Sequence, residues 1–211
     1  MLISSEKLSL FVLASVGILL IPGPNVIYIV TRSIAQGRAA GIASVLGINL
    51  ATLTYTVAAA LGLAAILLAS APAFNVVKWA GAAYLVYMGI RAFLSKGALE
   101  AIQPRKDGLF RVFAEGYVVN LLNPKVAFFI FAFLPQFVDP SHGQVVLQIL
   151  ALGGLFALLA IFSDGSYALL ASSLGRWLQR NPYYFKRQRY VTGSIYIVLG
   201  VTSAFTGSHH K

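Results

Sequence analysis

Long apolar segments separated by short polar connections run along the whole chain. A helix needs about 20 mostly apolar residues to cross a bilayer. The pattern predicts six such helices, near residues 8–31, 42–68, 73–94, 112–135, 145–172 and 190–207. The sequence therefore predicts an all-α membrane protein whose single transmembrane domain covers residues 1–211.

Two short polar interruptions that contain proline lie in the middle of apolar segments. Pro22-Gly23-Pro24-Asn25 interrupts the first segment, and Asn123-Pro124-Lys125 interrupts the fourth. Proline lacks the N–H that a helix needs, so the nearby backbone must find partners other than its own helix, and in a membrane these belong to protein or to a cavity. We predict that the first and fourth helices are broken and that both breaks line a substrate path; a plain proline kink is the alternative at the first.

The two breaks also resemble each other in sequence. Leu19-Leu20-x-Pro22 and Leu121-Leu122-x-Pro124 share their spacing, and apolar residues follow both. If each break belongs to a unit of three helices, near residues 1–94 and 112–207, the odd number of helices inverts one unit relative to the other. The pattern thus predicts two inverted three-helix repeats.

The first break frees backbone groups that could bind a ligand. Pro22 cannot donate to the carbonyl of Ile18, and Pro24 cannot donate to that of Leu20. Free carbonyls attract ammonium groups, while the N–H groups that start the next helix beyond Asn25 attract carboxylates. These two ends suit a zwitterion.

Lys125 in the second break would point away from Asn123 on a regular helix, whereas Asn120 and Asn123 share a face. A charged residue at the membrane centre costs about 2.5 to 3.5 kcal/mol. We therefore expect Pro124 to break the helix, so that Asn123 and Lys125 both face the interior; snorkelling of Lys125 to an interface is the alternative.

Asp164, inside the fifth segment, is the best counter-charge for Lys125, because Glu115 lies at the amino-terminal end of the fourth segment. We predict that Asp164 pairs with Lys125 or carries a proton; an Asp164 that simply reaches the interface is the alternative. On the second segment Asn49, Thr52 and Thr56 form a polar stripe that joins helices or lines the path.

Charge and composition limit the class of protein. With 58% hydrophobic and 10% charged residues, the chain lacks the polar surface of a soluble protein, and it contains no cysteine for disulfides or thiolate ligands. The apolar run from Leu8 to Thr31 exceeds the core of a signal peptide, so we expect it to remain as the first helix. Small residues at Ala43, Gly47 and Ala51 predict close helix packing.

The distribution of Lys and Arg predicts the orientation. Twelve flank the first, third and fifth connections, against Lys7, Lys78 and Lys211 on the other side. The positive-inside rule then places these connections in the cytoplasm and both termini outside, in the periplasm. The basic, aromatic stretch 173–189 has an RNA or lipid-headgroup site as its alternative, but topology already explains its charges.

Together these motifs resemble the lysine exporter and homoserine/threonine efflux (LysE/RhtB) family. The resemblance rests on both breaks, on Gly37 and Gly41, on the run from Lys78 to Leu85, and on Leu134-Pro135-Gln136-Phe137, in family order. It implies a six-helix exporter of amino acids or their derivatives in the bacterial inner membrane, driven by the proton gradient. By matching positions it makes Pro22, Gly23, Pro24, Asn25, Asn123, Pro124 and Lys125 the substrate-path residues.

Other functions fit less well. The three histidines lie in a loop or tail, which disfavours a hydrolase, and the intramembrane acids are too few for a metal exporter. We expect a small-molecule substrate and a lipid bilayer as partners, with no cofactor, metal or nucleic acid. A non-selective channel, or an exporter of another small cationic or zwitterionic solute or metal ion, stays the alternative, and the sequence leaves open whether the protein is a homo-oligomer.

Overall fold

The computed structural model describes residues 3–69, 79, 87, 90 and 107–179. Helices make up all of the regular structure in these residues. The α-helices are α1 (Ser5–Leu20), α2 (Pro24–Gln36), α3 (Arg38–Ala69), α5 (Leu109–Leu121), α6 (Pro124–Phe128) and α7 (Val145–Gln179). A π-helix, η1 (Phe129–Phe133), and two 3-10 helices, η2 (Leu134–Phe137) and η3 (Pro140–His142), follow α6.

Two helices are long and apolar enough to cross a membrane without interruption, through Arg38–Gly62 of α3 and Val145–Ser173 of α7. Two bent pairs, Ser5–Leu20 with Pro24–Gln36 and Leu109–Leu121 with Pro124–Phe137, each turn by 54° and bring the possible spans to four. The predicted all-helical fold is therefore confirmed in the described residues, and the candidate spans are consistent with a membrane protein. The predicted spans 73–94 and 190–207 lie outside the described residues, apart from single positions in the first of them.

The helix ends follow from local chemistry. The side chain of Ser4 accepts a hydrogen bond from the backbone N–H of Lys7 and starts α1. Pro24 and Pro124 each occupy the first turn of a helix, where a missing N–H costs nothing. Gly37 ends α2 with a φ of +84°, a conformation that favours glycine.

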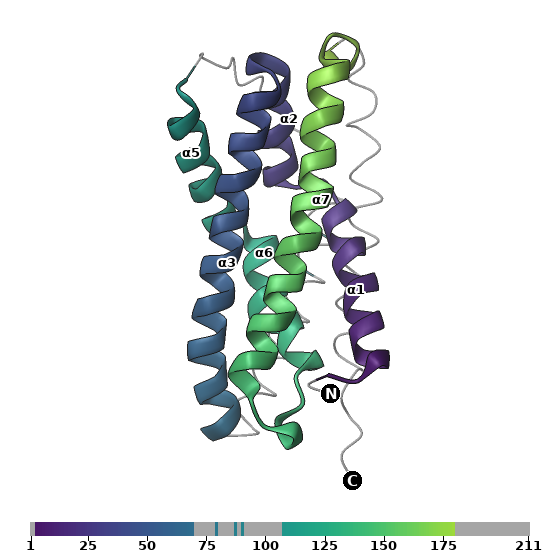
Figure 1. Ribbon diagram of the computed structural model, residues 1–211, viewed down its shortest axis with the longest axis vertical. Coiled ribbons are helices and arrows are strands. Elements are labelled where there is room, and N and C mark those ends of the chain that lie inside the picture. The colour runs from purple at the N-terminus through teal and green to yellow at the C-terminus, as the bar shows by residue number, and fades with distance from the viewer. Residues whose placement is uncertain (1–2, 70–78, 80–86, 88–89, 91–106, 180–211) are drawn as a thin grey trace.

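The described helices form an elongated bundle (Figure 1). Both broken spans bend near the middle of its length: α1 and α6 occupy the lower half of Figure 1, whereas α2 and α5 occupy the upper half. The first span runs upward and the fourth downward, while α3 runs downward and α7 upward. The two breaks thus come to the same level inside the bundle.

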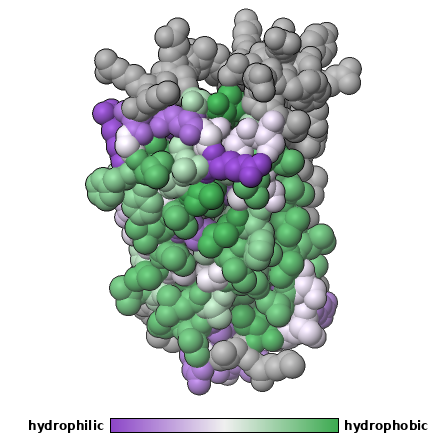
Figure 2. Space-filling view, turned by 45° about the horizontal axis from the view of Figure 1, so that its top comes forward, coloured by the Kyte–Doolittle hydropathy of each residue, from purple (hydrophilic) through white to green (hydrophobic). Residues whose placement is uncertain are grey.

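Small residues allow α3 and α5 to pack closely, as the sequence predicted. A Cβ placed on Gly47 would lie 2.0 Å from the carbonyl oxygen of Phe113, and one on Gly116 would lie 2.9 Å from that of Ser44. Another side of α3 is exposed and apolar, with Ile42, Leu46, Leu50, Leu53, Val57 and Leu61 along it. Figure 2 shows a broad hydrophobic flank, with hydrophilic residues gathered toward the ends of the molecule. This surface suits a lipid environment.

Candidate functional site

A buried network of asparagine side chains joins the two breaks. Asn25, in the first turn of α2, donates from Nδ2 to Oδ1 of Asn120 at 2.8 Å, and Asn123 donates from Nδ2 to Oδ1 of Asn25 at 2.9 Å. Asn120 in turn donates to the carbonyl of Ile48 and to Oγ1 of Thr52 on α3. Because each of these amides is buried and partnered, the network fixes the position of one break against the other.

Lys125 lies between the breaks and is only 5% exposed, so it does not reach a membrane interface. Its Nζ donates to the carbonyls of Ile21 at 2.7 Å and Ile18 at 3.2 Å, at the carboxyl end of α1. A Cβ placed on Gly23 would lie 3.5 Å from this Nζ, so the ammonium rests beside the backbone of the first break. The partial negative charge at a helix carboxyl terminus stabilises a cation there.

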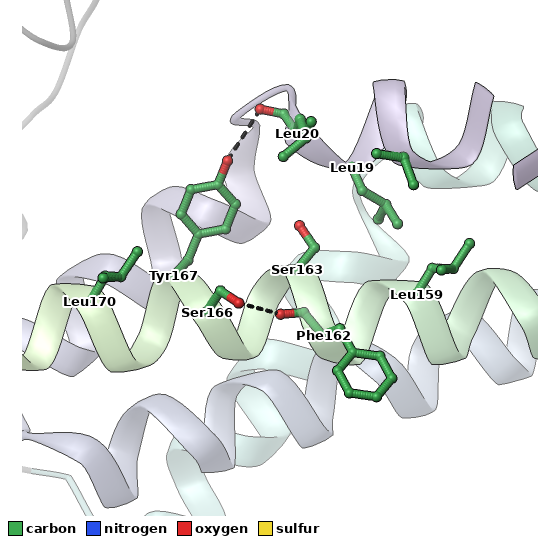
Figure 3. A pocket seen from close by; sticks show the side chains of 9 residues that line it. Leu19, Leu20, Leu159, Phe162, Ser163, Ser166, Tyr167 and Leu170 are labelled. Atoms are coloured by element: carbon green, nitrogen blue, oxygen red, sulfur yellow. Dashed lines mark hydrogen bonds between the residues drawn. The ribbon is translucent and has the colours of Figure 1, made fainter. Parts of the chain in front are cut away.

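The other carbonyl freed at the first break also has a protein partner. Tyr167 on α7 donates its hydroxyl to the carbonyl of Leu20 at 3.2 Å (Figure 3). Sequence reasoning predicted that the carbonyls of Ile18 and Leu20 would be open to a ligand; in this conformation Lys125 and Tyr167 occupy them. A matching contact exists at the second break, where the hydroxyl of Tyr55 donates to the carbonyl of Leu121.

A crevice of about 420 Å³ lies beside Tyr167, between α1 and α7 (Figure 3). Its described lining is mostly apolar, with Val16, Leu19, Leu20, Leu159, Phe162, Ser163, Ser166, Tyr167 and Leu170. The hydroxyl of Ser166 donates to the carbonyl of Phe162 in its own helix. The buried hydroxyl of Ser163 has no hydrogen-bond partner among the described residues.

Asp164 is buried on α7, with 4% of its surface exposed, so it does not reach an interface. Its charge and that of Lys125 act on each other. Within the part of the chain that the structure describes, however, no ion pair within 4.0 Å joins them. Asp164 is therefore a neighbouring counter-charge of Lys125 without direct contact in this conformation.

The structure divides the polar stripe of α3. Asn49 donates to the carbonyl of Ala157 at 2.8 Å and so joins α3 to α7, away from the asparagine network. Thr52 belongs to that network, whereas Thr56 donates to the carbonyl of Thr52 in its own helix. Interhelical bonding, one of the two interpretations of this stripe, accounts for Asn49.

A second polar group, which the sequence analysis did not bring together, lies between α2 and α5. Arg32 donates to Oδ2 of Asp107 at 2.8 Å and also to Glu115. Arg111 donates to Oε1 of Glu115 at 3.0 Å, and Tyr28 donates its hydroxyl to the carbonyl of Val112 at 2.8 Å. The spacing of four residues, Tyr28 to Arg32 on α2 and Arg111 to Glu115 on α5, was the available signal, because it places each pair on one helix face.

No group of three potential metal ligands occurs among the residues that the structure describes. The buried groups at the two breaks are carbonyls, amides and single charges of both signs, an arrangement suited to binding a small polar molecule.

Comparison with known proteins decides the family. The model of the family described as LysE type translocator matches residues 16–207. The chain belongs to this family. The LysE resemblance noted from the sequence is thereby confirmed, and the chain is a member of a family of membrane translocators.

Named relatives of this LysE family member cover most of its length. A homoserine/homoserine lactone efflux protein of Salmonella typhimurium is 32% identical over 197 residues, which cover 92% of this chain and 94% of the relative. An uncharacterised membrane protein of Vibrio cholerae is 28% identical over 195 residues. A leucine efflux protein of Salmonella choleraesuis is 29% identical over 149 residues, 67% of this chain and 68% of the relative. No solved structure matches the chain.

Proposed function

We propose that this protein exports amino acids across the bacterial inner membrane in exchange for protons. Two kinds of relative, named for the efflux of homoserine or its lactone and of leucine, support amino acids as the substrate class. The observation that carries the proposal is the buried meeting of two broken helices, which places carbonyls, amides and one ammonium at the middle of the bundle. A translocator needs such a polar site far from both membrane surfaces.

The ammonium of Lys125 marks where the amino group of a substrate would be held. Ile18 and Ile21 offer carbonyl oxygens at the negative end of α1, and Lys125 now binds both. When Lys125 swings away, the same oxygens accept a substrate ammonium. The start of α2 at Pro24 and Asn25 then faces the substrate carboxylate. The proposed substrate path comprises the residues of the two breaks and of the asparagine network: Pro22, Gly23, Pro24, Asn25, Asn120, Asn123, Pro124 and Lys125.

Proton coupling rests on Asp164 in this proposal. A buried carboxylate near a buried ammonium favours either the charged pair or a state in which one of them is neutral. A proton that enters from outside neutralises Asp164, weakens its attraction for Lys125 and lets the ammonium return to α1. One proton and one substrate therefore exclude each other, which is the requirement for antiport.

The arrangement of the breaks supports two inverted repeats. Pro24 and Pro124 each open the second half of a broken span, and the two broken spans run in opposite directions. The tyrosine contacts have the same relation: Tyr167 on the fifth span binds the end of α1, and Tyr55 on the second span binds the end of α5. A twofold axis in the membrane plane would exchange these contacts.

The charges at the two ends of the bundle support the predicted orientation. Arg32, Arg38 and Arg111 lie toward the end that holds the start of α3, whereas Lys7 lies at the other, paired with Asp139. The positive-inside rule then makes the end with the arginines cytoplasmic. The substrate would enter there and leave at the end near Lys7.

Reconstitution into liposomes tests the function. With the lumen at neutral pH and the outside acidic, we expect labelled amino acid loaded inside to leave faster than without the gradient, and a protonophore to abolish the difference. Counterflow separates a transporter from a channel, because a channel gives no transient accumulation of label against its gradient. Overexpression in cells exposed to a panel of toxic amino-acid analogues ranks the substrates; no protection against any analogue contradicts the export of amino acids.

A further inference from the structure

A large cavity opens between α2 and α5, between the first break and the end of the bundle that holds the arginines. Its volume is about 750 Å³, within the range of small-molecule sites. The described residues that line it are Pro24, Ile27, Tyr28, Thr31 and Arg32 from α2, and Arg111, Ala114, Glu115, Val118 and Val119 from α5. Pro24 precedes Asn25 in the chain, so the cavity lies next to the buried asparagine network.

Charged groups of opposite sign stand on the wall of this cavity. The side chain of Arg32 is 9% exposed, and it binds Glu115 and Asp107. Arg111 binds the second oxygen of Glu115. The cluster of two arginines and two carboxylates has no net charge. Arg32, Arg111 and Glu115 line the cavity, whereas Asp107 does not.

An ion cluster of this kind is poorly explained by stability alone. Two charges that leave water lose hydration free energy, which their mutual attraction often only offsets. Charged residues within membrane spans are more often functional than structural. The remaining wall is mostly apolar, with Ile27, Ala114, Val118 and Val119, and its described residues include no second carboxylate for a cationic substrate side chain.

We propose that this cavity is the loading site of the transporter and that it takes a neutral, zwitterionic amino acid. The inference rests on the proposed export of amino acids and adds the substrate class. The planar guanidinium of Arg32 binds the substrate carboxylate through paired hydrogen bonds, and Glu115 accepts the substrate ammonium. The substrate thus replaces the contact between Arg32 and Glu115, while its uncharged side chain packs on the apolar wall.

The charge balance of the site sets its selectivity. A zwitterion exchanges one pair of opposite charges for another, so the net charge of the cluster and its ligand stays unchanged. A cationic amino acid such as lysine would bring an additional charge to a wall whose described residues include no second acid, at the cost of burying an unpaired charge. We therefore expect preference for neutral over cationic amino acids.

Binding of three related probes to the purified protein in nanodiscs tests the contact of Arg32 with the substrate carboxylate and that of Glu115 with the substrate ammonium. The probes are L-leucine, leucinamide, which lacks the carboxylate, and 2-hydroxyisocaproate, which lacks the ammonium. The unaltered protein should bind leucine at least about tenfold more tightly than either analogue, because each loses a charge-assisted contact. In Arg32→Gln the ratio of the affinity for leucine to that for leucinamide should fall toward one. In Glu115→Gln the ratio of the affinity for leucine to that for 2-hydroxyisocaproate should fall toward one.

Matched variants separate binding from folding. Asp107→Asn also removes a partner of Arg32, yet both ratios should persist, because Asp107 does not line the cavity. If Arg32→Gln does not reach the membrane, Glu115→Gln still tests the contact with the substrate ammonium. Ala114→Phe fills the cavity and should weaken leucine binding by at least about tenfold, whereas Ala58→Phe, on the exposed face of α3, should bind as the unaltered protein does.

The outcomes distinguish this inference from the proposed function. A protein that moves no amino acid in liposomes refutes export itself. A protein that exports amino acids while both ratios stay unchanged in Arg32→Gln and Glu115→Gln refutes the loading site and leaves export intact. Preference for lysine over leucine would also overturn the assignment of a neutral substrate.

Discussion

Lys125 connects two elements that are about a hundred residues apart in sequence. Its backbone belongs to the first turn of α6, but its ammonium binds the carbonyls of Ile18 and Ile21 at the end of α1. The charge of Asp164 on α7 lies near enough to act on it. One residue thus belongs to the second break, binds the first break and lies near the fifth span.

Replacement of Lys125 by methionine should remove transport and reduce the amount of folded protein. Met removes the donor that binds the carbonyls of Ile18 and Ile21 and leaves the charge of Asp164 uncompensated, and breaking a buried pair costs about 3 to 5 kcal/mol. Lys125→Arg should also fail to transport, because its planar, permanently charged fork does not copy a compact ammonium. Abundance in membranes and efflux of labelled amino acid measure both effects.

A double substitution shows which effect comes from Asp164. Lys125→Met combined with Asp164→Asn should recover part of the lost abundance without restoring transport. Lys7→Met is the matched control, because Lys7 binds Asp139 near the end of the bundle and takes no part in the proposed path. A Lys125→Met protein that exports at the rate of the unaltered protein would end the assignment of Lys125 to the path.

The sequence predicted the local backbone geometry of these residues but not their contacts with distant parts of the chain. Pro124 made it clear that Asn123 and Lys125 leave regular helix geometry, and both are buried. The same argument left the carbonyls at the first break open, since no local rule says that Lys125 and Tyr167 reach them. The pairing of Arg32 with Glu115 could not be predicted, because the two residues lie more than eighty positions apart in the sequence.

At the scale of elements, too, local features of the broken helices could be predicted from the sequence, whereas long-range packing could not. Proline and glycine fix where α1 ends and where α2 and α6 begin, so the breaks could be predicted. The π-helix and 3-10 turns of η1 and η2 after α6 were not, because they depend on how the aromatic side chains of Phe129, Phe133 and Phe137 pack. Close packing of α3 on α5 was expected from small residues, but the partner helix was not.

Gly47 should be essential to the packing of α3 against α5. A methyl group at this position would lie 2.0 Å from the carbonyl oxygen of Phe113, so Gly47→Ala forces the helices apart, at a cost of about 1 to 3 kcal/mol. Gly62→Ala, in the same helix, meets no atom within 4 Å and should be neutral or slightly stabilising. Thermal unfolding of both variants in detergent measures the difference; equal midpoints would contradict this packing.

The turn of η3 should contribute stability that depends on pH. A hydrogen bond from the Ser141 hydroxyl to Asp139, with a smaller effect of Lys7, lowers the pKa of this carboxyl from its ordinary value of 3.8 to about 2. Because the pKa is lower in the folded protein, the contribution is full above about pH 4 and is lost as the pH falls toward 2.

Ser141→Ala should therefore lower the unfolding temperature at pH 7, and its difference from the unaltered protein should shrink as the pH approaches 2. Ser9→Ala is the control, because the hydroxyl of Ser9 binds only a carbonyl of its own helix and should give a difference that does not vary with pH. A Ser141→Ala difference that is constant from pH 7 to pH 2 would contradict this account.

At the scale of the whole molecule, the charges separate along the bundle. The proposed loading site lies toward the end with the arginines, the asparagine network lies near the middle, and the pair of Lys7 and Asp139 lies toward the other end. The count of basic residues along the sequence predicted only that the arginines gather at one end. The contacts between distant spans, such as Asn49 with Ala157, needed the structure, because a helix pattern does not specify its neighbours.

The orientation in the membrane gives the final prediction, and the absence of native cysteine makes it direct to test. Ser141 is exposed in the turn beside Lys7, at the end predicted to face the periplasm. Gly108 is exposed before α5 at the opposite end, with a φ of −61° and open space around its Cβ position, so a cysteine fits there. In intact cells a membrane-impermeant maleimide should label Ser141→Cys and leave Gly108→Cys unlabelled until the membrane is permeabilised. The reverse pattern would show that the twelve basic residues flanking the odd connections face outward, and it would move the proposed loading site to the exit side of an exporter.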